Sequence, residues 1–255
     1  VGQTAGAVGG FDAINQLVQI PETFKDAAAI STVDGSVTKI EEAPQGGHYI
    51  YVGPEKHYMS SDQLPTVKLG QTVEAGDPLS DGIPNPELLV KYKGIGEGRR
   101  LFVNAFQNTL KNSGVTANRR NVELLARGVI NHVEVTDIDG PNGSVMGDVV
   151  EYDNLSRNYQ PRADSIVTNL SHARNKFLEK PTMHYSIGTR ITPSIQKTLK
   201  DNGINDVLVN DKEPGFQPQM IRIMENLSHA DDWQVRMGGF YLGKGLYDAA
   251  QAGST

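Results

Sequence analysis

Residues 64–126 read LPTVKLGQTVEAGDPLSDGIPNPELLVKYKGIGEGRRLFVNAFQNTLKNSGVTANRRNVELLA and contain two successive patterns. In the first half, short β-prone pieces alternate with glycines at positions 70, 76 and 82, which is typical of a small barrel or sandwich. In the second half, mostly apolar residues recur at the spacing of one helical face, namely Leu101, Phe102, Ala105, Phe106, Thr109 and Leu110. The stretch therefore predicts a small β module followed by helices, and the expected fold class is α+β.

The residues before this stretch extend the β module. Residues 29–43, AISTVDGSVTKIEEA, alternate apolar and polar side chains around Asp34-Gly35, a dipeptide typical of a hairpin turn. A second turn is expected at Gly53-Pro54. The first 29 residues are rich in Gly and Ala instead, and a helix there is expected to end by Gln19, because Pro21 disfavours helical geometry at its predecessor.

The residues after the stretch mix helices with short strands. A helix capped by Asn118 or Asn121 is expected to run to Ile130, followed by a strand, a Gly-rich turn and a second strand. The polar region 155–181 is expected to be a loop or a long helical connection. A further helix opens at Thr192-Pro193 and closes at Gly203 before the strand DVLVN, and the tail is expected to be helical.

Four parts follow from these patterns. Residues 1–29 form a helical segment, 30–93 the small β barrel or sandwich, 94–150 a helical module with a hairpin, and 151–255 a C-terminal α/β module.

The composition excludes several classes of protein. The 255 residues contain no Cys, which excludes disulfides, thiolate catalysis and thiolate zinc sites. A net charge of −6 argues against a surface that wraps nucleic acid throughout, although local basic sites remain open. No apolar run approaches the roughly 20 residues that a membrane span needs, so we predict a soluble protein with no membrane contact.

No motif in the sequence completes an active site. The glycines of GIGEG, residues 94–98, lack the strand-turn-helix setting of a dinucleotide-binding loop. Asp137 and Asp139 in TDIDGPNG lack the later ligands of a calcium loop, and a solvated turn explains them better. No His pair has the spacing of a zinc hydrolase. These residues therefore favour turns and packing positions over chemistry.

Taken together and in order, the quoted stretch resembles the late part of the β′ subunit of bacterial-type DNA-directed RNA polymerase. There a barrel with a Gly-Asp turn, here GQTVEAGDPLSDG, is followed by a Pro-containing link, a short helix ending at a glycine, here Gly94, and two further helices. Upstream, VGQTAGAVGGFDAINQL is similar to the helix that enters the trigger loop of that family. Downstream, GDVVEYDNLSRNY and the terminal GGFYLGKGLYDAAQAGS are similar to its later segments.

The resemblance implies roles for four residues of the first segment. Gln16 and Leu17 match the Gln-Leu pair of the trigger helix, and Thr23 and Lys25 stand near its Thr-Phe-His stretch, so that Lys25 would be the cation near the triphosphate. Pro21 interrupts this helix and the family's Arg is absent, and these departures favour the alternative that the segment is a linker packed on its neighbours.

The resemblance also implies a metal cofactor, partner molecules and a location for this chain. The family's aspartate-rich Mg²⁺ loop has no match here, so Mg²⁺ is expected on another part of β′ and this chain alone is not expected to polymerise nucleotides. Expected partners are a β-like subunit, the N-terminal part of β′, template DNA and nascent RNA, in the cytoplasm of a bacterial host or in a phage virion. A split polymerase of a large bacteriophage, a catalytically degenerate β′-like virion protein and an unrelated carrier domain with a lipoyl-like barrel remain alternatives.

Overall fold

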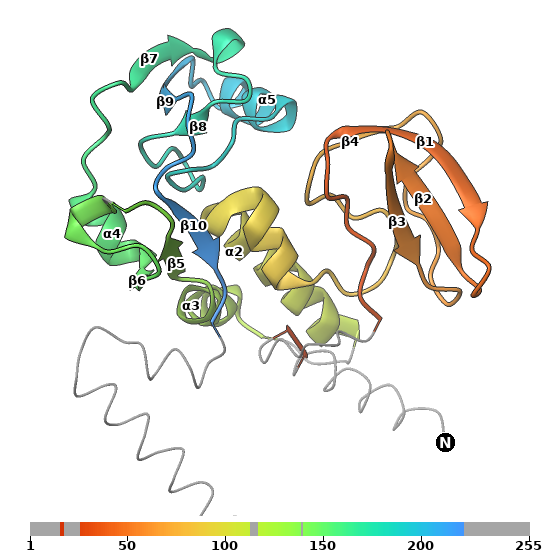
Figure 1. Cartoon of the computed structure of the whole chain (residues 1–255). Coiled ribbons are helices and arrows are strands. Elements are labelled where there is room, and N and C mark those ends of the chain that lie inside the picture. The colour runs from red at the N-terminus through yellow and green to blue at the C-terminus, as the bar shows by residue number, and fades with distance from the viewer. Residues whose placement is uncertain (1–15, 18–25, 113–116, 139, 222–255) are drawn as a thin grey trace, which may run out of the picture.

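The computed structural model describes residues 16–17, 26–112, 117–138 and 140–221. Within these ranges the chain mixes helices with three antiparallel sheets, which confirms the α+β class. The long helix α2 (Pro86–Asn112) lies between the first sheet on one side and the other two sheets on the other (Figure 1). In the described part of the chain no helix is both long and apolar enough to cross a membrane.

The first sheet is a curled four-stranded antiparallel sheet in the order β3-β2-β1-β4. Its strands are β1 (Gly35–Glu42), β2 (His48–Val52), β3 (Glu55–Met59) and β4 (Thr72–Val73). Gly53 has a φ of 57° in the turn between β2 and β3, which confirms the turn predicted at Gly53-Pro54. Alternate residues of the strands point inward to a core of their own, formed by Ala29, Val37, Ile50, Val52, Met59, Val67, Val73 and Leu79.

The hairpin predicted at Asp34-Gly35 is wrong. β1 begins at Gly35, and the turn that reverses the chain into β2 lies at residues 43–47. Gly35 pairs with Val73 of β4, and the carboxylate of Asp34 accepts a hydrogen bond from the backbone N–H of Ala75. Tertiary partners far along the sequence therefore determine the role of this dipeptide.

Helix α2 contains a kink at Gly94, whose φ of 82° and ψ of 169° are not helical. The kink separates the short helix that begins at Pro86 from the longer one that runs to Asn112, as the sequence predicts. A glycine suits this position because other residues adopt a positive φ only at a cost. The helix axis therefore changes direction between the two parts of α2.

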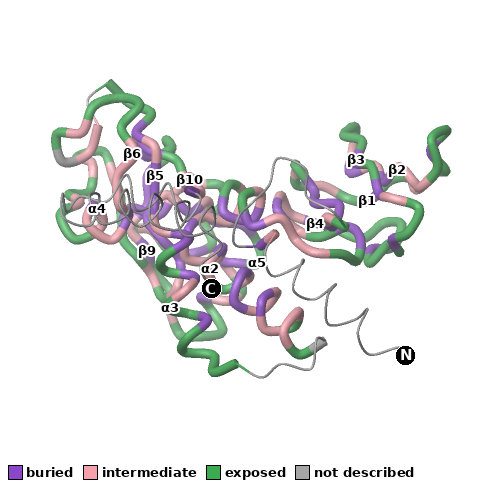
Figure 2. The backbone as a smooth tube through the Cα atoms, turned by 90° about the horizontal axis from the view of Figure 1, so that it is seen from below, coloured by how far each residue is buried: buried purple, intermediate pink, exposed green. Residues whose placement is uncertain are grey.

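The second sheet has the order β10-β5-β6 and packs with α2, α3 and α4. Its strands are β5 (His132–Val135), β6 (Val149–Glu151) and β10 (Phe216–Gln219), and the helices are α3 (Arg119–Val129) and α4 (Tyr152–Asn158). Asn118 caps α3 by accepting from the N–H of Arg120, which confirms one of the two predicted caps. Figure 2 shows buried residues along β5, β10 and α2 where these elements lie together. The main core includes Leu17, Phe102, Val122, Ile130, Val133, Tyr152 and Phe216.

The third sheet has the order β7-β9-β8 and packs with α5. Its elements are β7 (Ile166–Asn169), β8 (Phe177–Leu178), β9 (Asp206–Asn210) and α5 (Pro193–Asp201). Thr192 caps α5, Pro193 is its first residue and β9 follows, all as predicted. Region 155–181 was expected to hold only a loop or a long helix, and it contains β7 and β8 instead, because both strands pair with β9.

Candidate functional site

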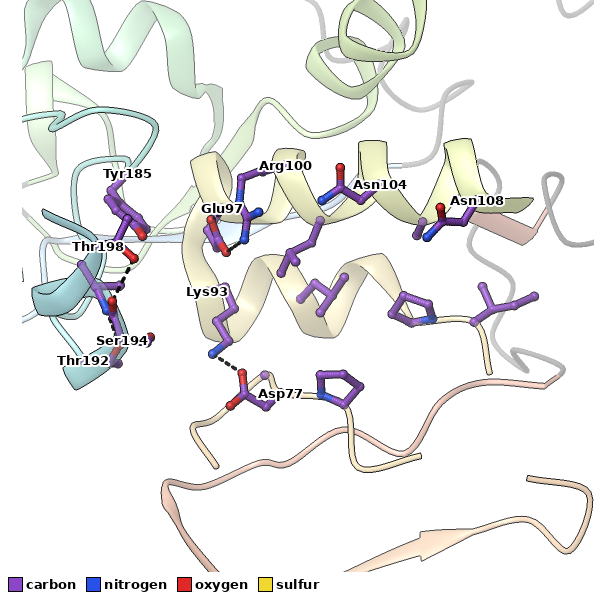
Figure 3. Close-up of a pocket in the computed structure, with 18 of the residues that line it drawn as sticks. Asp77, Lys93, Glu97, Arg100, Asn104, Asn108, Tyr185, Thr192, Ser194 and Thr198 are labelled. Carbon is purple, nitrogen blue, oxygen red and sulfur yellow. Dashed lines mark hydrogen bonds and ion pairs between the residues drawn. The ribbon is translucent and has the colours of Figure 1, made fainter. Parts of the chain in front are cut away.

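A cavity in the described part of the chain lies beside the kink of α2. It has a volume of about 740 Å³ and is lined by both parts of α2, by loop 76–84 and by the start of α5 (Figure 3). Arg100, Asn104 and Asn108 follow one another at four-residue intervals along the second part of α2 and face this cavity. The site is therefore a cleft between α2, loop 76–84 and the start of α5, with polar side chains set in a largely apolar lining.

The GIGEG motif lies at the kink beside this cleft, and its glycines serve close packing. A Cβ atom at Gly96 would lie 1.7 Å from the carbonyl oxygen of His184, and one at Gly94 would lie 2.9 Å from Oγ1 of Thr189. The chain from residue 184 to 189 thus crosses α2 at backbone distance, which only glycine permits. The motif is a contact between segments about 90 residues apart, as the packing interpretation predicts.

Glu97, the fourth residue of the motif, contacts Arg100 one turn later on α2 and His184 of the segment that crosses the helix. Its carboxylate accepts from Nε of Arg100 at 2.8 Å and lies 2.8 Å from Nε2 of His184. Burial raises the pKa of Glu97, but the hydrogen bonds and charges of Arg100 and His184 outweigh burial and hold that pKa below its ordinary value. Glu97 is therefore an anion in the folded chain.

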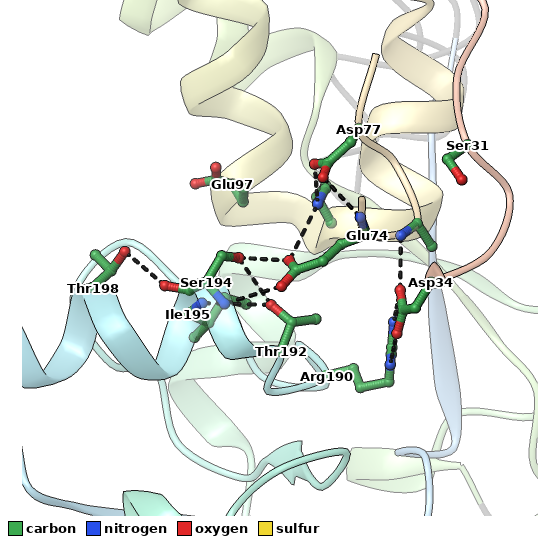
Figure 4. Close-up of polar contacts among 12 residues, drawn as sticks. Ser31, Asp34, Glu74, Asp77, Glu97, Arg190, Thr192, Ser194, Ile195 and Thr198 are labelled. Atoms are coloured by element: carbon green, nitrogen blue, oxygen red, sulfur yellow. Dashed lines mark hydrogen bonds and ion pairs between the residues drawn. The ribbon is translucent and has the colours of Figure 1, made fainter. Parts of the chain in front are cut away.

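A second carboxylate, Glu74, caps the first turn of α5 (Figure 4). Its oxygens accept from the backbone N–H of Ser194 at 3.0 Å and from the Ser194 hydroxyl at 2.5 Å. Lys93 of α2 lies 3.7 Å from Glu74 and donates to Asp77 at 2.7 Å. A carboxylate at a helix N-terminus satisfies free N–H groups and interacts favourably with the helix dipole. Glu74 thereby connects the first sheet with α2 and α5.

A third carboxylate contact, after those of Glu97 and Glu74, is the ion pair between Asp34 and Arg190. The guanidinium donates to both oxygens of Asp34, at 2.6 and 2.9 Å, in a bidentate arrangement (Figure 4). The hydrogen bonds from Arg190 hold the pKa of Asp34 below its ordinary value, although partial burial opposes this shift. We call the contacts made by Asp34 and Glu74 the carboxylate clasp, because they join the first sheet to residues 190–194.

Acid is expected to open the carboxylate clasp. The folded-state pKa values of Asp34 and Glu74 lie below the ordinary values of 3.8 and 4.5, so their stabilising contribution is present above those values and is lost as the pH falls from them through the lower folded-state values. The melting temperature, measured by differential scanning fluorimetry, should fall between about pH 5 and pH 3. The double variant Asp34→Asn, Glu74→Gln should melt lower at pH 7 and fall less steeply, whereas Asp62→Asn, at an exposed carboxylate, should behave like the parent. An unchanged pH profile in the double variant would contradict the clasp.

The structure places two of the four predicted catalytic residues. Gln16 and Leu17 lie in a helical turn, and Leu17 has no exposed surface because it is part of the main core. Thr23 and Lys25 lie outside the described residues, as does the predicted helical tail. The catalytic roles of all four stay predictions.

The cleft contains no arrangement for metal chemistry among the residues that the structure describes, where no group of three or more His, Asp or Glu side chains could hold an ion. The two carboxylates that line it are occupied, Asp77 by Lys93 and Glu97 by Arg100 and His184, so the site fixes elements relative to one another. Sequence reasoning missed the contacts of Asp34 and Glu74, because their partners lie more than 100 residues away and no local pattern marks them.

No protein-family model matches the chain. Among curated proteins, it is 31% identical over 161 residues to the β′ subunit of DNA-directed RNA polymerase from Deinococcus radiodurans, an alignment that covers 58% of this chain and 10% of the relative. The β′ subunit of Thermus aquaticus is 33% identical over 157 residues, with the same two shares. That of Aquifex pyrophilus is 27% identical over 158 residues, which is 56% of this chain and 10% of the relative. The chain thus spans about a tenth of the length of these relatives, and more than half of it is similar to a region of β′.

Proposed function

We propose that this chain is a C-terminal part of the β′ moiety of a DNA-directed RNA polymerase and supports template-dependent RNA synthesis as one piece of a larger assembly. The observation that carries the proposal is the similarity to β′ subunits over more than half of the chain. The curled sheet, the helix kinked at Gly94 and α3 are consistent with it, because they occur in the order that the resemblance implies.

The proposal assigns this chain a supporting role. The Mg²⁺ ions of nucleotidyl transfer would be held by carboxylates on another part of β′, and a β-like subunit, template DNA and nascent RNA would complete the assembly. A split enzyme of the kind found in large bacteriophages is the specific form that we propose. The carboxylate clasp would hold the curled sheet and α5 in fixed positions on α2.

Reconstitution tests this function. The full chain is combined with a β-like subunit, an N-terminal β′ piece that has an Asp-x-Asp-x-Asp loop, DNA template, Mg²⁺ and nucleoside triphosphates, and labelled RNA is measured. Synthesis should require this chain, and Lys25→Ala and Thr23→Ala should each lower the elongation rate about tenfold or more, because a positioned cation or donor near the triphosphate is lost. The control Lys68→Ala removes an exposed lysine from the part of the chain that forms the first sheet, and it should leave the elongation rate unchanged. RNA synthesis that proceeds equally without this chain would contradict the proposal.

A second candidate is a β′-like structural protein that has lost catalysis, such as a virion component. The complete burial of Leu17 in the main core favours it, because a residue held there by packing is not free to close over a nucleotide. Full RNA synthesis by the Lys25→Ala and Thr23→Ala complexes would favour this structural role for the first segment. Assembly of the chain into particles that contain no β-like subunit would favour the structural role for the whole chain.

A further inference from the structure

The loop between β5 and β6, residues 136–148, exposes three large apolar side chains to solvent. Ile138 is 80% exposed, Val145 63% and Met146 60%. Exposed apolar residues scattered singly over a surface are ordinary, whereas several on one loop form a patch of the kind that marks contact sites. We call these three side chains the apolar tip.

Local contacts hold this loop in a defined shape. The backbone N–H of Gly147 donates to the carbonyl oxygen of Val135 at 2.8 Å, and the N–H of Val145 donates to Oδ2 of Asp148 at 2.8 Å. A Cβ atom at Gly140 would overlap Cγ1 of Val135, so the loop folds back closely on the end of β5. A surface that is already ordered loses little conformational entropy when a partner covers it.

Carboxylates border the apolar tip and determine which surfaces it can contact. Asp137 and Asp148 are both exposed, and neither forms an ion pair with a lysine or an arginine among the residues that the structure describes. Their charges would repel the phosphates of nucleic acid, anionic lipid headgroups and the same loop of a second copy of this chain. They would attract lysine or arginine side chains that lie beside an apolar surface.

The small area of the apolar tip indicates how long a partner stays bound. Three side chains offer a few hundred Å² of apolar surface, whereas stable protein–protein interfaces bury roughly 1,200 to 2,000 Å² in total. A contact of this size fits a partner that binds and dissociates better than it fits a permanently held subunit.

We infer that the apolar tip is a docking site for a separate protein that binds transiently and whose contact face is apolar and bordered by lysine or arginine. The inference goes beyond the proposed function and does not rest on it, because the exposed side chains of one loop carry it. Charge complementarity selects a protein partner over a nucleic acid, a membrane or a second copy of the chain.

Fluorescence anisotropy with the full 255-residue chain and a labelled peptide tests this docking site. The peptide is a short amphipathic helix whose leucine stripe is bordered by lysines, and a counterpart carries glutamate in place of lysine. The double variant Val145→Ser, Met146→Ser should weaken binding of the lysine peptide about tenfold, because two apolar side chains leave the contact. Asp137→Asn should weaken it about twofold to threefold and reduce its dependence on salt. The glutamate peptide should bind the parent chain at least about tenfold more weakly.

Two matched controls separate the apolar tip from the rest of the surface. Leu69→Ser removes an apolar side chain that is 65% exposed between β3 and β4, and Asp62→Asn removes an exposed carboxylate. Neither control should change the affinity for the lysine peptide. All the replaced side chains are exposed, so every variant should keep the melting temperature of the parent, and a loss of binding is then not a loss of folding.

Other outcomes overturn the inference. These outcomes are no binding of the lysine peptide to the parent chain, equal losses in Leu69→Ser and in the double variant, and equal binding of the two peptides. Binding of the parent chain to vesicles of phosphatidylcholine and phosphatidylserine that is lost in the double variant would also overturn it, because the apolar tip would then contact a membrane. Since the assay contains no other subunit, its result would stand even if the reconstituted assembly made no RNA.

Discussion

Gly96→Ala is expected to lower the free energy of unfolding by about 3 kcal/mol and the melting temperature by roughly 6 to 12 °C. An alanine Cβ at this position would lie 1.7 Å from the carbonyl oxygen of His184 and 2.8 Å from its carbonyl carbon. Both are backbone atoms, so no rotation of a flexible side chain can relieve the overlap. The segment 184–189 must move away from α2, and the contact of Glu97 with His184 would be lost with it. Urea denaturation followed by circular dichroism measures the loss.

The matched control for this variant is Gly128→Ala in α3. A Cβ at Gly128 would meet nothing within 4 Å, and alanine is the better helix former by about 0.5 to 1 kcal/mol. Gly128→Ala should therefore be neutral or slightly stabilising. If Gly96→Ala were equally harmless, residues 184–189 could not lie across the kink of α2 at the distance described.

The second large effect is expected at Glu179, which follows β8 and has a fully buried side chain. Its oxygens accept from Nε of Arg162 at 2.8 Å, from the backbone N–H of Arg162 at 3.1 Å and from the hydroxyl of Tyr159 at 2.9 Å. Arg162 also donates to the carbonyl oxygens of Lys212 and Glu213, so the pair joins the link before β7 to the link after β9. Glu179→Ala leaves the half-buried guanidinium without its anion and should cost about 3 to 5 kcal/mol.

Chemical denaturation of Glu179→Ala and of the double variant Glu179→Leu, Arg162→Met tests whether this ion pair stabilises the fold. The double variant should recover much of the loss, because replacing both partners of a buried ion pair removes the uncompensated charge. Lys39→Ala is the control: it breaks an exposed ion pair with Glu41 and should leave stability essentially unchanged. A loss in Glu179→Ala no larger than in Lys39→Ala would show that the pair does not hold these links together.

The sequence predicted local features of the fold well where one short pattern determines them. Asn118 and Thr192 cap their helices, and Gly94 ends the first part of α2, because a capping side chain or a positive φ acts within a few residues. The role of Asp34 could not be predicted, since its choice of Arg190 over a hairpin turn depends on a partner 156 residues away. The strands β7 and β8 were missed for a similar reason, as they exist through pairing with β9.

The cavities and the GIGEG motif likewise depend on contacts between residues that are far apart in the sequence. The GIGEG glycines lie inside α2 and not between a strand and a helix, but the sequence alone did not reveal that they let residues 184–189 cross α2. One cavity between α2 and α3 is lined by four arginines, Arg99, Arg100, Arg119 and Arg127, although no sequence motif contains them together. Only the packing of α3 against α2 brings their charges to one cavity.

The pairing of β10 with β5 has a consequence for the order in which the chain folds during synthesis. Residues 29–79 supply a complete core for the curled sheet, so that module can fold as soon as it leaves the ribosome. The main core instead needs Phe216, which pairs with Val135 and packs with residues of α2 and α3 made about 100 residues earlier. Translation must therefore pass residue 219 before the central layer can close, and until then the apolar helix faces of this core lack part of their packing partners and are prone to aggregation.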